Sequence, residues 1–284
     1  MQSHSFLSAD DILTPARAEA INSTQSSLTA VQDTQMLAWI QYLENRFIEE
    51  AHTKHTLGGW SWTRKVRNFQ TIAKTTLSAA ITSTSPATFS LTSGTGFDAT
   101  GRIAIETAKG AVDFVDCTIS GSTATPSTTA GADVVSMTHA SGEKVHKLYA
   151  LPSDYGKTFR LLMGEKIDFQ PHRDIILFPD FYYFTEIGSY ILLPRDIGAQ
   201  DFTHYYFRKG NTISALTTET SIPKMGLRWA VEMTLMHLFR IRRKREDIAT
   251  SVQLAEMEMS RMLNYDKSIS SQNASHGLRT STFR

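Results

Sequence analysis

The sequence predicts an α+β protein in which the N- and C-terminal helices pack together as a helical domain and an antiparallel β domain protrudes from it. Three observations predict this class. Apolar residues recur at helical spacing near both ends of the chain. The middle of the chain has short runs of alternating apolar and polar residues, bounded by Gly, Pro and Asp, as in antiparallel strands. Part of that middle is so rich in Ser and Thr that we interpret it as a β insert.

Residues 8–74 predict the N-terminal helices and the first strand. In "ILTPARAEAI", Thr14 is expected to cap a helix and Pro15 to occupy its first turn. The polar stretch "NSTQSS" then predicts a break, and the paired glycines of "TLGGW" predict the end of a second helix. The apolar stripe of that second helix is formed by Leu28, Val31, Trp39, Ile40, Leu43 and Phe47.

Residues 75–142 predict a small β-barrel or sandwich, inserted between strands of the segment that follows. The runs "ATFSLT", "GRIAIE" and "VDFVDCTIS" alternate in polarity, and Thr suits strands because it is branched at Cβ. A flexible Ser/Thr linker is the alternative interpretation. Such a linker would lack these evenly spaced apolar residues, so we favour the β insert.

Residues 143–216 predict further strands with larger side chains. The runs "KVHKLYALPSDY", "FYYFTEIGSYILLPRD" and "DFTHYYFRKG" are separated by turns that contain Pro or Gly. Their aromatic residues are expected to fill the core of the β domain.

Residues 217–265 predict one long C-terminal helix or two consecutive helices, with Ser221 and Pro223 at the start. The stretch "LRWAVEMTLMHLFRI" is apolar on nearly every face, which is typical of a buried helix. The following stripe lies on one face only and consists of Ile248, Val252, Ala255, Met259 and Met262. Residues 266–284 are polar and rich in Ser, which predicts an extended arm.

Composition excludes several classes of protein. The formal net charge is +1, so the overall balance does not indicate a nucleic-acid partner. The single cysteine, Cys117, excludes an internal disulfide framework and suits folding in a reducing cytoplasm. The start "MQSHSFLSADDIL" lacks the features of a signal peptide, and no apolar run approaches the roughly 20 residues of a membrane-spanning helix. We therefore expect no membrane partner.

The sequence predicts neither an enzyme nor a site for a cofactor or metal. The glycines of "SGTGFDATG" have the wrong spacing for a dinucleotide fingerprint and predict a turn instead. His52 and His55 are three residues apart, but no further ligand or Glu base accompanies them, so we interpret "AHTKH" as a solvated helix end. The chain has no P-loop and no GxSxG motif, and Cys117 is expected to be an ordinary strand residue.

The run "RIRRKR" is the most strongly charged stretch of the chain. Arg240, Arg243 and Lys244 share one side of a helix, because successive residues turn by about 100°. Arg242 and Arg245 point elsewhere, two acidic residues follow at once, and no aromatic residue lies within the tract. Three interpretations stay open: a solvated helix turn, a contact for another protein, or direct contact with DNA.

Several short motifs follow one another in a fixed order. After the helical N-terminus comes "GGWSWTRKVRNFQTI", then "LYALPSDYGKTFRL", then "HYYFRKGNTISALTTETSIPKMGLRWAVEMTLMHLFR". This order resembles that of the head-to-tail adaptor proteins of tailed bacteriophages, also called connector, head-completion or tail-tube gatekeeper proteins. The resemblance depends on Trp60, Trp62, Tyr149, Leu151, Pro152, Asp154, Tyr205, Tyr206, Arg208, Ile222 and Pro223. The Ser/Thr-rich insert departs from the most compact members of the family.

The resemblance implies a structural virion protein at the head–tail junction, made in the host cytoplasm. It implies a ring, commonly of twelve copies, below the portal protein, which links the portal to a tail, stopper or tail-tube protein. Genomic DNA would pass through the lumen without sequence-specific binding. A C-terminal arm would dock on the portal. The residues expected to bind the portal or a neighbouring subunit are then Arg240, Arg242, Arg243, Lys244, Arg245, Leu278, Arg279, Phe283 and Arg284.

Two other functions remain as alternatives to the adaptor. One is a nucleic-acid-binding protein that uses the basic run, and its affinity for DNA would fall steeply as salt rises. The other is a wall-degrading virion enzyme, although no residue of the sequence stands out as catalytic.

Overall fold

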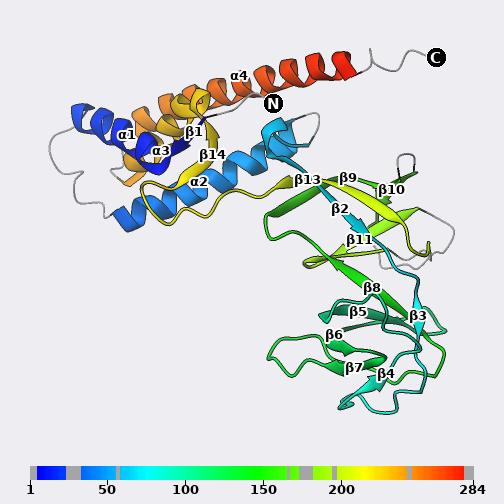
Figure 1. The fold of residues 1–284 in the computed structure, drawn as a ribbon. Coiled ribbons are helices and arrows are strands. Elements are labelled where there is room, and N and C mark those ends of the chain that lie inside the picture. The colour runs from blue at the N-terminus through cyan, green and yellow to red at the C-terminus, as the bar shows by residue number, and fades with distance from the viewer. Residues whose placement is uncertain are drawn as a thin grey trace, which may run out of the picture. The chain divides into compact units, whose positions relative to one another are not determined.

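The computed structural model describes residues 5–23, 33–55, 58–164, 167–172, 182–193, 197–241 and 245–277. The fold is mixed α+β, with four α-helices and a large, mostly antiparallel sheet among these residues, as the sequence predicts (Figure 1). The chain forms two compact units. Unit 1 comprises Met1–Lys65 and Phe207–Arg284, and unit 2 comprises Val66–Tyr206.

Unit 1 has one apolar core to which both ends of the chain contribute. Its strands β1 (Phe6–Ser8) and β14 (Glu219–Pro223) pair antiparallel. In the core, the Phe47 ring lies 4.8 Å from the Trp60 ring and 5.1 Å from the Trp229 ring. The helices that enclose this core are α1 (Ala9–Ser23), α2 (Asp33–Lys54), α3 (Leu227–Ile241) and α4 (Arg245–Gly277).

Helix α1 begins at Ala9, so the prediction that Thr14 and Pro15 start a helix is wrong. Ser8 and Asp11 form the N-terminal cap. The Ser8 N–H donates to Asp11 Oδ2 at 2.8 Å, and the Asp11 N–H donates to Ser8 Oγ at 3.2 Å. This reciprocal pair satisfies the N–H groups of Ser8 and Asp11, whereas those of Ala9 and Asp10 donate to the carbonyl oxygens of Thr218 and Leu216. The bonds from Ser8 lower the pKa of Asp11. Pro15 lies inside the helix.

Replacement of Ser8 by Ala is expected to lower the free energy of unfolding by about 1 kcal/mol, because it leaves the Asp11 N–H without its side-chain acceptor. Urea denaturation measures the change, and Ser8→Thr should restore most of it. Thr14→Ala is the matched control, since the Thr14 hydroxyl bonds only the exposed Asp10 carboxylate at 2.9 Å. A larger loss for Thr14→Ala than for Ser8→Ala would contradict this assignment of the cap.

The start of α3 also differs from the prediction. Ser221 and Pro223 belong to β14, and α3 begins at Leu227 after a 3-10 turn over Lys224–Gly226. The reason is that Ser221 is held elsewhere. Its N–H donates to both carboxylate oxygens of Glu44 on α2, at 2.9 and 2.8 Å.

Helix α4 continues to Gly277, so the predicted extended arm is wrong for residues 266–277. No glycine or proline occurs between Arg245 and Gly277, so this stretch has no strong helix terminator. Residues 278–284 lie outside the described residues. None of the described helices combines the length and apolar character needed to cross a membrane.

Unit 2 is built on the large sheet, which has the strand order β2-β13-β9-β10-β11-β12-β8-β5-β6-β7-β4, with β3 also paired to β8. All neighbours with a described register are antiparallel except β10 and β11, which are parallel. The strands of its first part are β2 (Arg64–Gln70), β8 (Lys144–Ala150), β9 (Tyr155–Met163), β10 (Ile167–Pro171), β11 (Tyr183–Ile187), β12 (Tyr190–Leu192) and β13 (Asp201–Arg208).

The first part of the sheet curls around its own core. Side chains of β2 reach β8, since the Phe69 ring lies 5.0 Å from the Tyr149 ring and Arg67 Nη1 donates to the carbonyl oxygen of Ala150. Between them lies a core that includes Leu161, Phe169, Phe184, Ile191 and Phe202. As predicted, aromatic residues supply much of this core.

The Ser/Thr-rich segment forms the second part of the sheet with a separate core. Its strands are β3 (Thr75–Thr76), β4 (Phe89–Ser90), β5 (Thr100–Glu106), β6 (Val112–Ser120) and β7 (Thr123–Pro126). This core is formed by residues between Leu77 and Val135 together with Val145 of β8. Strand β8 belongs to both parts of the sheet, because it pairs with β12 on one side and with β5 on the other. Cys117 is buried in β6, and burial raises the pKa of its thiol to about 12. It is therefore an inert strand residue, as expected.

Candidate partner-binding surface

Of the nine residues predicted to bind a partner, the structure places the side chain of one. Arg240 is exposed in the last turn of α3. Arg245 is the first residue of α4, but its side chain is outside the described part. The other seven lie outside the described residues: Arg242, Arg243, Lys244, Leu278, Arg279, Phe283 and Arg284.

A stack of three rings lies next to Arg240 and was not predicted from the sequence. His237, one turn before Arg240 on α3, stacks on Trp39 of α2, with ring centroids 3.9 Å apart and planes 8° apart. Trp39 stacks in turn on Tyr42, with centroids 5.0 Å apart. Tyr42 is 49% exposed. The stack therefore connects the basic end of α3 with the exposed face of α2.

The charge of this surface is concentrated at the α3 end. Among the described residues Arg240 has no carboxylate partner. Burial, and then the charge of Arg240, lower the pKa of His237 and so favour the neutral form of its ring. Near Tyr42, the charge of Arg46 is compensated by Glu50, whose Oε1 accepts a bond from Arg46 Nε at 2.7 Å. We call Trp39, Tyr42, His237 and Arg240 the α2–α3 surface.

This composition suits a protein contact better than the stacking of nucleobases. Trp, Tyr and Arg are the residues most enriched at the centres of protein interfaces. Single-stranded nucleic acid binds instead to successive open rings. Here Trp39 stacks with both other rings, and Tyr42 is the exposed ring of the three.

A buried polar network lies elsewhere in unit 1, where Asp266 of α4 meets the end of α2. Asp266 Oδ2 lies 2.8 Å from His55 Nε2 and accepts a bond from the Ser61 N–H at 3.0 Å, while Ser61 Oγ donates to Asp266 Oδ1. His55 is 4% exposed, so the prediction of a solvated helix end is wrong. Its partner follows about 200 residues later in the chain, and no local pattern reveals it.

The same network contains Ser, His and Asp but does not have the arrangement of a catalytic triad. In a triad the histidine lies between the serine hydroxyl and the carboxylate and takes the hydroxyl proton. Here Asp266 lies between Ser61 and His55. The carboxylate accepts the bonds from Ser61, contacts His55 and holds α4 against the turn after α2, so we assign the network a structural role.

The buried histidines of unit 2 have partners within their own sheet. His139 lies between Asp113 at 3.1 Å and Glu143 at 2.7 Å, and His146 contacts Glu106 at 2.8 Å. His204 Nε2 lies 3.0 Å from the Thr158 hydroxyl. In the described part of the chain, no group of three or more His, Cys, Asp or Glu residues is placed to hold a metal ion.

Comparison with known proteins gives no family. No protein-family model matches the chain, and no curated protein matches it.

Proposed function

We propose that the protein is a head-to-tail adaptor of a tailed bacteriophage, a structural virion protein that forms a ring below the portal. In this role it links the portal to a tail, stopper or tail-tube protein while genomic DNA passes through the ring. The observation that carries the proposal is that the motifs of the resemblance contact one another in the fold.

Motifs that are far apart in the sequence meet in pairs. Tyr206 Oη donates to Asp154 Oδ1 at 3.0 Å. This bond joins the strand with the "YY-x-R" motif (residues 205–208) to the turn after the "LP" pair (residues 151–152). Trp62 Nε1 donates to the Ser221 carbonyl at 3.2 Å, and Arg208 Nη2 donates to Ser221 Oγ at 3.4 Å. Ser221 directly precedes the "IP" pair. Within each unit, motifs that are far apart in the sequence are thus connected by hydrogen bonds.

Glu44 connects α2 to the loop between the "YY-x-R" and "IP" motifs. Its buried carboxylate accepts bonds from the N–H groups of Asn211, at 2.8 Å, and Ser221. Burial raises the pKa of Glu44, and the bonds from these donors oppose that rise. A Cβ atom on Gly210 would lie 2.8 Å from Glu44 Cγ, so the chain passes too close for a larger residue. The polar loop is held firmly on the helix, as a rigid adaptor requires.

The α2–α3 surface is our candidate for the contact with the portal or a neighbouring subunit. It has an exposed Tyr ring for apolar contact and an arginine without a described carboxylate partner. A partner that fits it presents an apolar side chain beside a carboxylate.

Replacement of Arg240 by Glu together with Tyr42 by Ala is expected to weaken co-assembly with the portal protein of the same virus at least tenfold, about 1.4 kcal/mol. The reasons are the loss of an exposed ring and the reversal of a charge that has no carboxylate partner among the described residues. Native mass spectrometry and electron microscopy of the co-expressed proteins measure complex and ring formation. The matched control is Arg261→Glu with Tyr265→Ala on α4, where both side chains are also exposed.

Two results would overturn the proposal. If the unchanged protein forms no complex with the portal, the adaptor function is wrong. If it binds double-stranded DNA with a steep salt dependence and the α2–α3 variant removes that binding, the nucleic-acid function replaces it. If the control variant weakens co-assembly equally, the adaptor function remains but the contact lies elsewhere.

A further inference from the structure

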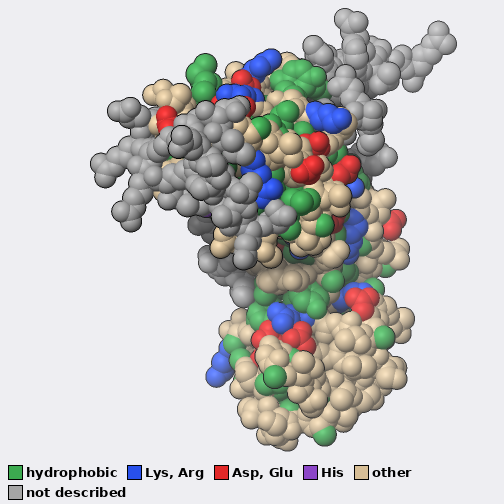
Figure 2. Space-filling model, turned by 90° about the vertical axis from the view of Figure 1, so that its left-hand side faces the viewer, with side chains coloured by type: hydrophobic (Ala, Val, Ile, Leu, Met, Phe, Trp, Pro, Cys, Tyr) green, Lys and Arg blue, Asp and Glu red, His purple; other side chains and the backbone are tan. Residues whose placement is uncertain are grey.

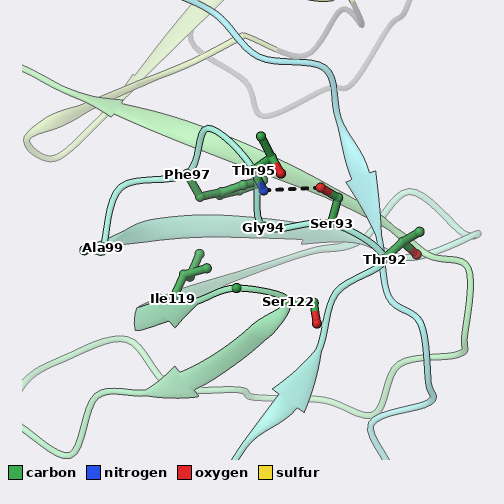
Figure 3. Close-up of a pocket in the computed structure, with 9 residues that line it drawn as sticks. Thr92, Ser93, Gly94, Thr95, Phe97, Ala99, Ile119 and Ser122 are labelled. Atoms are coloured by element: carbon green, nitrogen blue, oxygen red, sulfur yellow. Dashed lines mark hydrogen bonds between the residues drawn. The ribbon is translucent and has the colours of Figure 1, made fainter.

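A hollow of about 410 Å³ lies in the Ser/Thr-rich part of unit 2. Figure 3 shows it between the loop that carries Ser93, Thr95 and Phe97 and the turn that follows Ile119. Its volume is within the range of about 300–1,000 Å³ that is typical of small-molecule sites. The lining residues are Thr92, Ser93, Gly94, Thr95, Phe97, Ala99, Ile119, Gly121 and Ser122.

The two walls of the hollow are fixed to each other by the backbone. The Leu91 N–H donates to the Ser122 carbonyl at 2.7 Å, and the Ile119 N–H donates to the Ala99 carbonyl at 2.9 Å. Gly94 packs so closely on Gly121 that a Cβ atom there would lie 1.8 Å from the Gly121 carbonyl oxygen. A ligand would therefore enter a site that is already formed, and binding would require little ordering of the chain.

The lining has hydroxyl groups and no charge. Of the residues that the structure describes, not one Lys, Arg, His, Asp or Glu lines the hollow, although a fifth of the chain is charged. The surface around β4 to β7 is also mostly uncharged on the face that Figure 2 shows. Among the described residues, the hydroxyls of Thr95 and Ser122 have no protein partner, whereas Ser93 Oγ accepts the Thr95 N–H at 3.2 Å (Figure 3).

Apolar surface is present as well, in the Phe97 ring and the Ile119 side chain (Figure 3). Without charged groups the hollow lacks the ion pairs that anions and cations require. Its hydroxyls can both donate and accept hydrogen bonds. A ligand that matches these properties has several hydroxyls and one apolar face of C–H groups.

We propose that this hollow binds a saccharide unit, with the sugar hydroxyls bonded to Thr95 and Ser122 and the C–H face of the sugar ring packed on Phe97. The proposal does not depend on the adaptor function. It assigns unit 2 a contact with a neutral glycan, either a free sugar or one residue of a polysaccharide.

The experiment is saturation-transfer NMR of the full chain with D-glucose, D-galactose, D-mannose and N-acetyl-D-glucosamine, and with the β-1,4-linked tetramers of glucose and N-acetylglucosamine. We expect saturable binding of at least one sugar with a Kd of about 1 mM, about 4 kcal/mol. Equal affinity for monomer and tetramer would indicate a free sugar as the ligand. Tighter binding of a tetramer would indicate a polysaccharide.

The variants test the place of binding. Thr95→Val with Ser122→Ala removes two exposed hydroxyls and is expected to weaken binding at least fivefold. Phe97→Ala is expected to do the same, and its folding is checked by circular dichroism because Phe97 packs against the core of the insert. The control is Thr118→Val with Ser120→Ala, exposed positions of β6 that do not line the hollow. The proposal is overturned if no sugar of the panel binds saturably, or if the control weakens binding as much as the double variant.

Discussion

Replacement of Asp266 by Ala is expected to lower the free energy of unfolding of unit 1 by about 3–5 kcal/mol, because it removes one partner of a buried polar network. Asp266 is 1% exposed and accepts the Ser61 N–H and hydroxyl while contacting His55. Without the carboxylate, the buried His55 ring and the half-buried Ser61 donors lose their partner. Urea denaturation followed by tryptophan fluorescence measures the loss, since the Trp60 ring lies 6.3 Å from the His55 ring.

Two further variants separate the buried network from a general effect on α4. Glu256→Ala changes an exposed carboxylate on the same helix and is expected to alter stability by less than about 0.5 kcal/mol. Asp266→Leu combined with His55→Leu removes the buried carboxylate and the buried ring together, so it should cost less than Asp266→Ala, and the loss that remains is that of the two Ser61 bonds. Equal stability of Asp266→Ala and Glu256→Ala would show that the network does not hold α4.

Lowering the pH from 7 to 4 is expected to destabilise unit 2 by up to about 3 kcal/mol through His204 alone, at about 1.4 kcal/mol per pKa unit. Burial, and then the charge of Arg67, lower the pKa of His204 to about 4. In the unfolded chain the same ring titrates near 6.5. Unfolding therefore takes up a proton below pH 6.5. The stabilisation of the folded state that depends on a neutral His204 ring is complete above that pH and is lost progressively as the pH falls toward 4.

The measurement is the free energy of unfolding between pH 4 and 7, for the unchanged protein and for His204→Gln. Carboxylates also titrate in this range, so the difference between the two proteins isolates the histidine. His204→Gln should show a weaker dependence on pH than the unchanged protein. Parallel pH profiles for the two proteins would contradict the low pKa of His204.

Local patterns were sufficient to predict the class of fold and most of its elements. Strand alternation in "VDFVDCTIS" placed Cys117 in a strand, and the apolar stretch after residue 226 predicted the buried helix α3. The wrong predictions arose where two possible helix caps competed, or where no helix-terminating residue followed a helix. Ser8 with Asp11 caps α1 in preference to Thr14 with Pro15. The Ser-rich C-terminal stretch stays helical because no residue breaks it before Gly277.

Local sequence patterns did not predict the contacts between segments that are far apart in the chain. The charge of the basic run was evident, but the ring stack beside it comes from α2, about 200 residues earlier. Trp39 was predicted only as part of an apolar stripe. Tyr42, three residues further on, carried no signal of its own. The hollow depends likewise on Gly94 meeting Gly121, while the glycine pattern alone predicted no more than a turn.

The strands β2 and β13, which lead into and out of unit 2, are neighbours in the sheet. For unit 1, the whole of unit 2 is therefore a single loop whose two ends already lie together. Closing an unfolded loop costs an entropy that grows with its length. Once unit 2 has folded, this entropic cost has already been met. The two segments that form the core of unit 1 can then pack together without closing a long unfolded loop. During synthesis, folding of unit 2 would therefore bring together the two chain segments that form unit 1.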